Sequence, residues 1–281
     1  MSRSQVFTLT LIAMIAFAGN SLLCRLALKH TAIDAASFTS IRILSGALML
    51  WFIVQIRSDA PKASGNWPSA LALFTYAAGF SYAYISLPAG TGALLLFGAV
   101  QATMIGYGLL SGERLQLRQI TGLVLAIGGL IGLLLPGLSA PPLQGSLLML
   151  AAGIAWGVYS LRGKGADDPT RVTGGNFLRA ALFAAGLSAI MLPWTSIDSA
   201  GVWYAVASGA IASGIGYAIW YTALGGLKAT SAATVQLSVP VIAAIGGIVF
   251  LGEPITPRFF ITSIAILGGV ALVIIQRQRI Q

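Results

Sequence analysis

The chain has 281 residues, of which 57% are hydrophobic and only 8% are charged, and its formal net charge is +9. Soluble domains carry roughly 25% charged residues, and a water-soluble fold of this composition would expose far larger apolar patches than such proteins tolerate. The composition therefore predicts an integral membrane protein. The sixteen basic residues are scattered through short polar breaks rather than gathered into a patch, so we expect no nucleic-acid partner.

Ten apolar segments follow one another, each of roughly 19–23 residues, the length needed to cross a hydrocarbon layer of about 30 Å. Backbone groups in lipid must be satisfied within their own segment, so every segment is predicted to be a helix. The fold class expected is an all-α integral membrane protein. The predicted spans are 6–28, 36–56, 68–87, 89–110, 116–135, 143–161, 174–193, 201–223, 229–251 and 257–276.

The first span imitates a secretory signal peptide. Arg3 is followed by an apolar run and then by Ala16-Phe17-Ala18, which matches an A-x-A cleavage pattern. The apolar character continues through Leu28, beyond a normal h-region. We therefore expect this segment to be retained as a membrane span.

Lys and Arg residues in the flanks of the spans predict their orientation. With the N-terminus inside, eleven of the sixteen basic residues fall on the inner side and five on the other, so both termini are expected in the cytoplasm. Four tryptophans occupy span ends, where interfacial anchors are found: Trp51, Trp67, Trp194 and Trp203.

The two halves of the chain repeat each other. Gly112-Glu113 recurs as Gly252-Glu253 at a displacement of 140 residues, and Arg42 recurs as Arg179 at a displacement of 137 residues. Each half holds five predicted spans, and this odd number forces the second half to enter the membrane from the opposite side. Such inverted repeats are typical of secondary transporters, whose substrate site lies near mid-depth between the halves.

The breaker-rich stretch around residue 137 separates the halves. We expect a first five-helix repeat at 1–137 and a second at 138–281, which together form one membrane domain.

Local motifs carry a family resemblance. Gly252-Glu253-Pro254-Ile255-Thr256 forms a short turn between the ninth and tenth predicted spans, and Tyr221-Thr222-Ala223-Leu224 ends the eighth. Together with the two five-helix halves, these motifs resemble the EamA type of the drug/metabolite transporter superfamily. The first half departs from the pattern, because Arg114 stands in place of Pro254 and Val100 in place of Pro240. Size and aromatic content are most similar to the aromatic amino acid exporters of the YddG type.

The resemblance implies a multi-pass protein of the bacterial inner membrane. It would export small metabolites, above all amino acids including aromatic ones, by alternating access. Its partners would be a small-molecule substrate and the lipid bilayer; the oligomeric state stays open, and a monomer is compatible with the sequence. No Walker A loop is present, so ATP is not the expected energy source.

The seven carboxylates all fall in polar breaks between spans. Proton-driven carriers usually keep an acid at mid-membrane, so we expect facilitated diffusion. The alternatives are export of other small metabolites such as nucleobases or carboxylates, a proton-coupled drug/metabolite antiporter, and a channel. The small four-helix multidrug antiporters of the same superfamily carry a glutamate in their first helix, which this chain lacks.

Enzymatic chemistry is not expected. An intramembrane hydrolase needs a base beside its nucleophile, and the sole histidine, His30, lies in a predicted loop. One histidine with one cysteine, Cys24, does not build a zinc or haem site of the usual kind. We expect no catalytic residue, metal or other cofactor.

Polar and aromatic side chains inside the spans are candidates for a wet substrate cavity, because a buried tyrosine hydroxyl needs a partner. For the hydroxyl residues at helical spacing in the ninth span, helix packing is an alternative to cavity lining. For Asn20, the alternative is a hydrogen bond between helices. Tyr76, Phe80 and Tyr84 share one helix face, with Tyr82 elsewhere on the same span. The candidate cavity residues are Asn20, Tyr82, Thr91, Gln101, Trp156, Tyr159, Tyr217, Ser231, Thr234 and Ser238.

Other side chains have two explanations. Tyr84 and Trp220 are expected to be interfacial anchors. Pro240 is expected to bend the ninth span and to act as a hinge. Arg42 and Arg179 lie about two helical turns inside their spans and either snorkel to headgroups or form the charged rims of the pathway.

The two Gly-Glu turns also have a structural and a functional explanation. A glycine after a helix suits the left-handed C-cap, and Glu113 and Glu253 are expected at the positive N-terminal end of the helix that follows each of them. Direct coupling to an ion is the alternative for both carboxylates.

Overall fold

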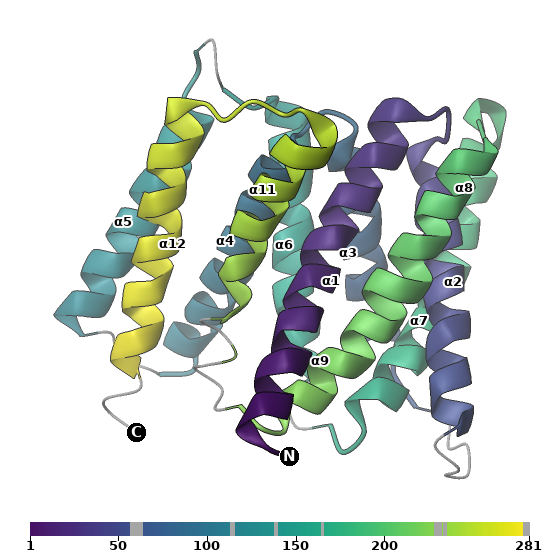
Figure 1. The fold of residues 1–281 in the computed structure, drawn as a ribbon, viewed down its shortest axis with the longest axis horizontal. Coiled ribbons are helices and arrows are strands. Elements are labelled where there is room, and N and C mark those ends of the chain that lie inside the picture. Colours follow the sequence, from purple (N-terminus) through teal and green to yellow (C-terminus); the bar gives the residue numbers. More distant parts are fainter. Residues whose placement is uncertain are drawn as a thin grey trace.

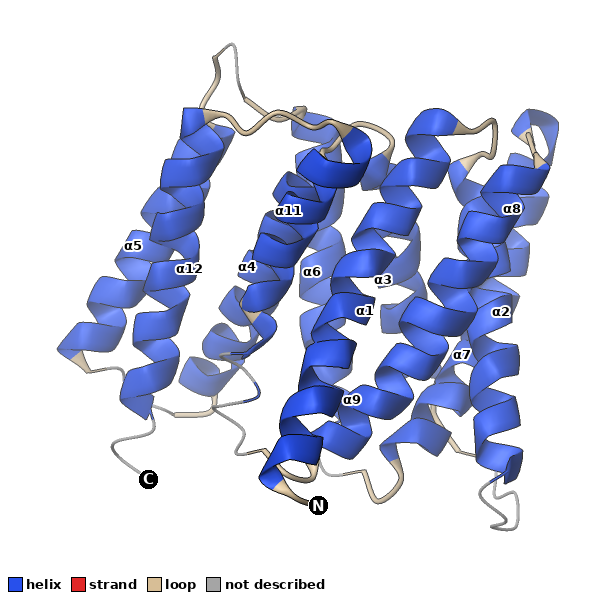
Figure 2. Cartoon of the chain, viewed as in Figure 1, coloured by secondary structure: helices blue, strands red, loops and turns tan. Residues whose placement is uncertain are grey.

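The computed structural model describes residues 1–56, 64–112, 116–137, 140–163, 166–227, 232 and 235–277. In these ranges the chain is helical, with short irregular connections and no strand (Figure 2). Eight described helical segments are long and apolar enough to cross a membrane, and Ser238–Leu251 is a shorter apolar helix. The predicted all-helical membrane fold class is therefore confirmed.

The helices begin and end within a few residues of most predicted spans. They are α1 (Arg3–His30), α2 (Ala35–Ile56), α3 (Trp67–Tyr84), α4 (Ala89–Leu110), α5 (Leu117–Leu134), α6 (Leu143–Gly163), α7 (Pro169–Met191), η1 (Leu192–Trp194), α8 (Ser199–Val206), η2 (Ala207–Ile215), α9 (Gly216–Leu224), α11 (Ser238–Leu251) and α12 (Pro257–Arg277). The nine-residue π-helix η2 joins α8 to α9 without a break, so the three form one long segment.

The ninth predicted span is where the structure differs most from the expectation. Part of 229–251 lies outside the described residues, and the described helix α11 begins only after a turn at Leu237. Pro240 is the third residue of α11, where a missing N–H costs no helical hydrogen bond. The break in this segment therefore lies before Pro240 rather than at it.

Side-chain caps fix several helix ends. Asn66 accepts a hydrogen bond from the Ser69 N–H at the start of α3, and Asp168 caps α7 in the same way through Arg171. These are ordinary N-caps, which satisfy backbone donors that the helix leaves unpaired. At the end of α11, Gly252 has φ 62°, the left-handed conformation expected for it.

Helices from the two halves of the chain lie side by side. α5 packs along α12, α4 against α11, and α2 against α7, and Figure 1 shows the first two pairs next to each other. α6 contacts α3 and α4, whereas α1 contacts η2, α9 and α11. The first turn of α1 and the last turn of α12 lie at the same end of the bundle (Figure 1).

The surface of the bundle is apolar and its interior holds polar groups. On α2, Leu44, Leu48 and Phe52 are more than half exposed, whereas Thr39 and Arg42 are buried. This is the arrangement expected in lipid, where intramembrane polar groups face the protein interior. Trp51, Trp67, Trp194 and Trp203 are all exposed, as the anchor prediction requires.

Candidate functional site

Five aromatic rings meet inside the bundle and are called here the central aromatic cluster: Tyr76 and Phe80 of α3, Trp156 and Tyr159 of α6, and Tyr217 of α9. The indole of Trp156 stacks on Tyr159 and on Tyr217, with both ring centroids 5.3 Å away and interplanar angles of 25° and 20°. Tyr76 lies 4.8 Å from Trp156. Aromatic pairs of this kind contribute about 0.5–1.5 kcal/mol beyond their buried area. The cluster thus joins three helices into one aromatic wall.

Four of the five rings, all except Tyr159, line a small central cavity of about 30 Å³, together with residues of α1, α4 and η2 and with Gln236. A cavity needs roughly 10–15 Å³ of accessible volume to hold one water molecule, so this cavity has room for about two water molecules. Binding sites for drug-sized ligands usually span about 300–1,000 Å³. In this conformation the helices are therefore closed around the centre.

A chain of hydrogen bonds, called here the polar chain, crosses four helices beside this cavity. Arg42 Nη2 of α2 donates to the Tyr76 hydroxyl at 2.9 Å, and Asn20 Nδ2 of α1 donates to the same oxygen at 3.3 Å. The Ser208 hydroxyl of η2 donates to Asn20 Oδ1 at 2.6 Å. Because the Tyr76 oxygen already accepts two bonds, its own proton is available to a further acceptor.

Arg42 is only 2% exposed, which corrects the expectation that it snorkels to a headgroup. Its role in the substrate pathway stays a prediction. Its guanidinium lies 4.7 Å from the Phe80 ring centroid and 5.2 Å from that of Tyr76. Its Nη1 is buried without a hydrogen-bond partner, and no described carboxylate forms an ion pair with it. The reason is the rotation of α2 about its axis, which turns Leu44 and Leu48 outward and Arg42 inward.

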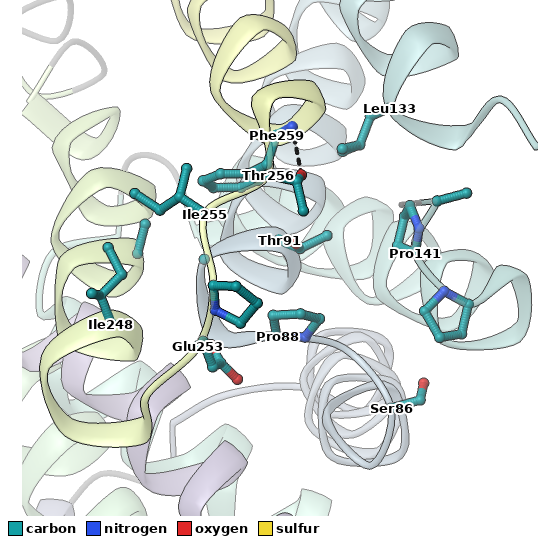
Figure 3. Close-up of a pocket in the computed structure, with 15 residues that line it drawn as sticks. Ser86, Pro88, Thr91, Leu133, Pro141, Ile248, Glu253, Ile255, Thr256 and Phe259 are labelled. Atoms are coloured by element: carbon teal, nitrogen blue, oxygen red, sulfur yellow. Dashed lines mark hydrogen bonds between the residues drawn. The ribbon is translucent and has the colours of Figure 1, made fainter. Parts of the chain in front are cut away.

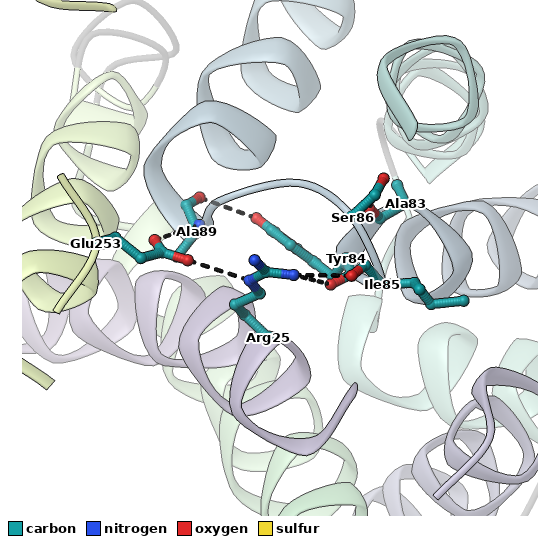
Figure 4. A network of polar contacts seen from close by, with 7 residues as sticks. All are labelled: Arg25, Ala83, Tyr84, Ile85, Ser86, Ala89 and Glu253. Atoms are coloured by element: carbon teal, nitrogen blue, oxygen red, sulfur yellow. Dashed lines mark hydrogen bonds and ion pairs between the residues drawn. The ribbon is translucent and has the colours of Figure 1, made fainter. Parts of the chain in front are cut away.

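A second buried arginine, Arg25 of α1, lies near one end of the bundle and has a carboxylate and two carbonyls as partners. Its Nε donates to Glu253 Oε1 at 3.1 Å, and its Nη1 donates to the carbonyls of Tyr84 and Ile85 at 2.9 Å each. Glu253 Oε2 accepts from the Ala89 N–H at 2.8 Å. Figure 4 shows how these groups tie α1, the end of α3, the start of α4 and the α11–α12 turn together. We call this set the Arg25–Glu253 latch.

The latch corrects two expectations about Glu253. The carboxylate is only 8% exposed, so the premise that every acid lies outside the apolar interior fails here. It also caps the start of α4 rather than that of α12, the helix that follows it. The left-handed Gly252 turns the chain so that the side chain points inward. Glu113 lies outside the described residues.

A larger cavity of about 230 Å³ opens beside the latch. It lies between the starts of α4 and α12, the end of α11 and the connection before α6, and Glu253, Thr91 and Phe259 border it (Figure 3). Thr91 is the one candidate cavity residue found here.

Another polar network joins helices near the starts of α3 and α7. Asn176 accepts a hydrogen bond from the Asn66 N–H at 2.9 Å and donates to the Tyr159 hydroxyl at 3.4 Å. Tyr159 in turn donates to Thr173, whose hydroxyl donates to Tyr221. This Tyr159–Asn176 network links α6, α7 and α9 to the start of α3.

Arg179 of α7 binds backbone carbonyls, and its role as a rim of the pathway stays a prediction. Its Nη1 donates to the carbonyls of Ser64 and Gly175 at 2.7 and 2.9 Å, and its guanidinium lies 6.0 Å from the Trp67 ring centroid. Arg42 and Arg179, which occupy equivalent positions in the two predicted repeats, therefore lie in different environments.

The other candidate residues divide into three groups. Asn20, Trp156 and Tyr217 line the central cavity, and Tyr159 supports it from behind through the stack on Trp156. Buried Gln101 and the partly buried Tyr82 and Ser238 line neither cavity. The Ser238 hydroxyl instead donates to the Val235 carbonyl. Ser231 and Thr234 lie outside the described residues.

Several residues were assigned wrongly or missed from the sequence. Tyr84 and Trp220, expected to be interfacial anchors, are 0% and 7% exposed. Tyr76, which joins the polar chain to the aromatic cluster, was not among the candidates. The i, i+4, i+8 stripe of Tyr76, Phe80 and Tyr84 was the available signal, because all three residues face the interior.

Comparisons with known proteins agree with this picture. Residues 143–275 match the model of the EamA-like transporter family. An uncharacterized protein of Pseudomonas aeruginosa is 58% identical, over 97% of this chain and 96% of its own length. A solved crystal structure has a TM-score of 0.68 at 20% identity, covering 99% of this chain and 100% of its own, which supports the fold alone.

More distant relatives carry functional names. A probable amino-acid metabolite efflux pump of Escherichia coli is 26% identical over 65% of this chain and 66% of its own length. The threonine/homoserine exporter of the same species is 34% identical over 48% of this chain and 47% of its own. With the family match and the membrane-spanning helices, these similarities place the protein among transporters: the chain belongs to the EamA type of the drug/metabolite transporter superfamily.

Proposed function

We propose that the protein is a secondary exporter of amino acids, including aromatic ones, in the bacterial inner membrane. The central aromatic cluster carries this proposal, because it combines stacked rings with amide and hydroxyl groups at one closed cavity. The rings suit the apolar part of an amino acid, and the polar groups suit its ammonium and carboxylate. The names of the distant relatives support amino acids as the substrate class. A specificity like that of the YddG-type exporters belongs to the same proposal.

The architecture proposed is ten spans in two inverted five-helix repeats, 1–137 and 138–281, with both termini cytoplasmic. The neighbour pairs support it. If the halves are exchanged, the contact of α3 with α6 becomes that of α9 with α1, and the contact of α4 with α6 becomes that of α11 with α1. Inverted repeats of this kind rock about a fixed central site.

The two polar networks that flank the aromatic cluster support alternating access as the proposed mechanism. The Arg25–Glu253 latch joins helices on one side of the cluster, and the Tyr159–Asn176 network joins helices on the other. An amino acid is larger than the central cavity, so the helices must separate for it to bind. If the latch opens while the Tyr159–Asn176 network stays closed, the central cavity is exposed to one side of the membrane. If the network opens while the latch stays closed, the cavity is exposed to the other side. Thr91, Gln101, Ser231, Thr234 and Ser238 remain proposed pathway residues, and Pro240 a proposed hinge.

Facilitated diffusion remains our proposal for the energetics. Proton-coupled export is the second candidate, and the buried Glu253 favours it. Protonation of this carboxylate would remove the partner of Arg25 and weaken the latch. Proton-driven carriers usually keep an acid in the membrane interior, and Glu253 is an acid buried in the protein at the α11–α12 turn.

Counterflow in liposomes tests the proposed function. Vesicles containing the purified protein are preloaded with one unlabelled amino acid, and labelled phenylalanine, methionine or threonine is added outside. We expect transient, saturable accumulation of label, strongest for phenylalanine. Absence of counterflow with every amino acid, from protein shown to be inserted, would contradict the proposal. Uptake driven by an imposed pH gradient alone would select the proton-coupled candidate.

A variant pair links the counterflow to the aromatic cluster. Trp156→Ala removes the ring shared by two stacks, and we expect phenylalanine counterflow to fall about tenfold, as for the loss of roughly 1.4 kcal/mol of binding. Trp203→Ala is the matched control, because this indole is 72% exposed on α8. Equal effects of the two substitutions would argue against binding at the cluster.

A further inference from the structure

Arg42 presents an imbalance of charge inside the bundle. An arginine stays protonated in proteins, and burying a charge is costly unless it is paired and hydrogen-bonded. Its guanidinium donates a hydrogen bond to a neutral tyrosine hydroxyl, and the two aromatic rings near it offer only cation–π contact. Within the described ranges no carboxylate balances this charge.

Arg42 is not itself a lining residue of the central cavity, but its guanidinium contacts two residues that are, Tyr76 and Phe80. Arg42 Nη1 is buried without a partner. Arg42 Nη2 is bonded to the Tyr76 hydroxyl, which belongs to a cavity-lining residue whose own proton is uncommitted. The other rings of the cavity are apolar surfaces. An anionic group that entered next to Tyr76 would therefore meet a cation and a hydroxyl donor together.

The other interior arginines are already occupied. Arg25 has Glu253 as its counter-ion, and Arg179 donates to two backbone carbonyls. Arg42 alone combines near-complete burial with an unsatisfied donor among these three. Charge-assisted hydrogen bonds from a guanidinium to a carboxylate are about twice as strong as neutral ones, so a carboxylate is the group that this position recognises best.

We propose that Arg42 binds the carboxylate of the transported substrate and that Tyr76 donates a second hydrogen bond to it. The substrate class is then a small carboxylic acid with an apolar or aromatic body, which the rings of the central aromatic cluster contact. This inference rests on the proposed function, since it assigns the substrate carboxylate to a residue of the same site.

Binding of an isosteric pair tests the inference directly. The probes are 3-phenylpropanoate and its neutral amide, and the readout is thermal stabilisation of the purified full chain in detergent. In the unmodified protein we expect the carboxylate to stabilise at about tenfold lower concentration than the amide, as one charge-assisted hydrogen bond implies. Arg42→Gln should abolish that preference. Equal stabilisation of the unmodified protein by both probes, or a preference that survives in Arg42→Gln, would overturn the inference.

Two further variants keep the test decisive. Arg179→Gln is the matched control from the equivalent position of the second repeat, and it should keep the preference for the carboxylate. Arg42→Lys retains the charge and serves if Arg42→Gln does not fold. An ammonium cannot reproduce the fork of a guanidinium, so carboxylate affinity should fall about tenfold while amide affinity stays unchanged. Unchanged carboxylate affinity in folded Arg42→Lys would also overturn the inference.

Counterflow separates this inference from the proposed function. Phenylalanine and phenylalaninamide are compared as preloads in the same liposomes. If phenylalaninamide supports counterflow as well as phenylalanine does, the proposed exporter function stands and the role of Arg42 is overturned. Carboxylate binding that depends on Arg42, without counterflow of any amino acid, would overturn the proposed function and leave the carboxylate site in place.

Discussion

Arg25 and Arg42 are both buried in the same bundle, at 8% and 2% exposure, yet they are satisfied in different ways. Arg25 meets a carboxylate and two carbonyls, and it holds together segments that are up to 228 residues apart in the chain. Arg42 has a tyrosine hydroxyl and two rings, with one nitrogen left over. A protein uses a compensated buried charge to fix its structure, whereas an uncompensated one is suited to receive something from outside.

The largest effect is expected from breaking the compensated pair. Glu253→Ala leaves the Arg25 guanidinium buried without its counter-ion, and removing one partner of a buried pair costs about 3–5 kcal/mol. The double variant Arg25→Met with Glu253→Ala should recover much of that loss, because it also removes the stranded charge. The free energy of unfolding in mixed micelles measures both.

Asp168→Asn is the control for this prediction. Asp168 and Arg171 form an ion pair at 3.6 Å with side chains that are 38% and 19% exposed. Exposed pairs contribute about 0.2–1 kcal/mol, so the loss should be much smaller. If Glu253→Ala were no worse than Asp168→Asn, the latch would not hold the structure together.

A smaller effect is expected where the charge is not compensated. Tyr76→Phe removes the hydroxyl that accepts from both Arg42 and Asn20. Leaving buried donors unsatisfied costs about 1–3 kcal/mol. Tyr82→Phe, on the half-exposed side of the same helix, should change the free energy of unfolding by less than about 0.5 kcal/mol. Similar values for the two would show that the polar chain contributes little to stability.

The smallest effect is expected at an acid outside the spans. Asp34 precedes α2, and its carboxylate accepts from the N–H groups of Ala36 and Ser37 at 2.9 Å and of Ser196 at 3.0 Å. Partial burial alone would raise the pKa of Asp34, but the hydrogen bonds from Ser37, Ser196 and Ala36 outweigh it and lower the pKa.

A lowered carboxyl pKa stabilises the folded protein above the unfolded-state pKa, and this stability is lost as the pH falls through the folded-state value. The melting temperature of the unmodified protein should therefore exceed that of Asp34→Asn at about pH 6, and the gap should narrow toward about pH 3. A gap that does not change with pH would show that the Asp34 hydrogen bonds do not depend on its ionisation.

Hydropathy predicted the helices because each one must satisfy its backbone alone. It did not predict how each helix is rotated. In a membrane bundle both the lipid-facing and the interior sides are apolar, so the polar–apolar contrast that orients a soluble helix is weak. Tyr82 and Tyr76 are six residues apart on α3, and only the packing of α3 against α6 and α2 decides which one faces the cavity.

The latch shows a second limit of the sequence. Glu253 stands in a polar break next to a glycine, which reads as a surface turn. Its burial depends on Arg25 and on the start of α4, which come from the other half of the chain. The position of Arg42 in its span predicts its depth, but no sequence pattern indicates whether a basic residue has a partner. In both cases the missing information is a contact between distant segments.

Cys24 sits next to Arg25 on α1 and is fully buried. It is the one cysteine of the chain, so this chain already carries a single reporter thiol in its interior. A maleimide can reach that sulfur only when the helices packed around α1 separate. At a fixed pH the rate of alkylation therefore records how often the interior becomes accessible, and the effect of added substrate would be read out without engineering any residue.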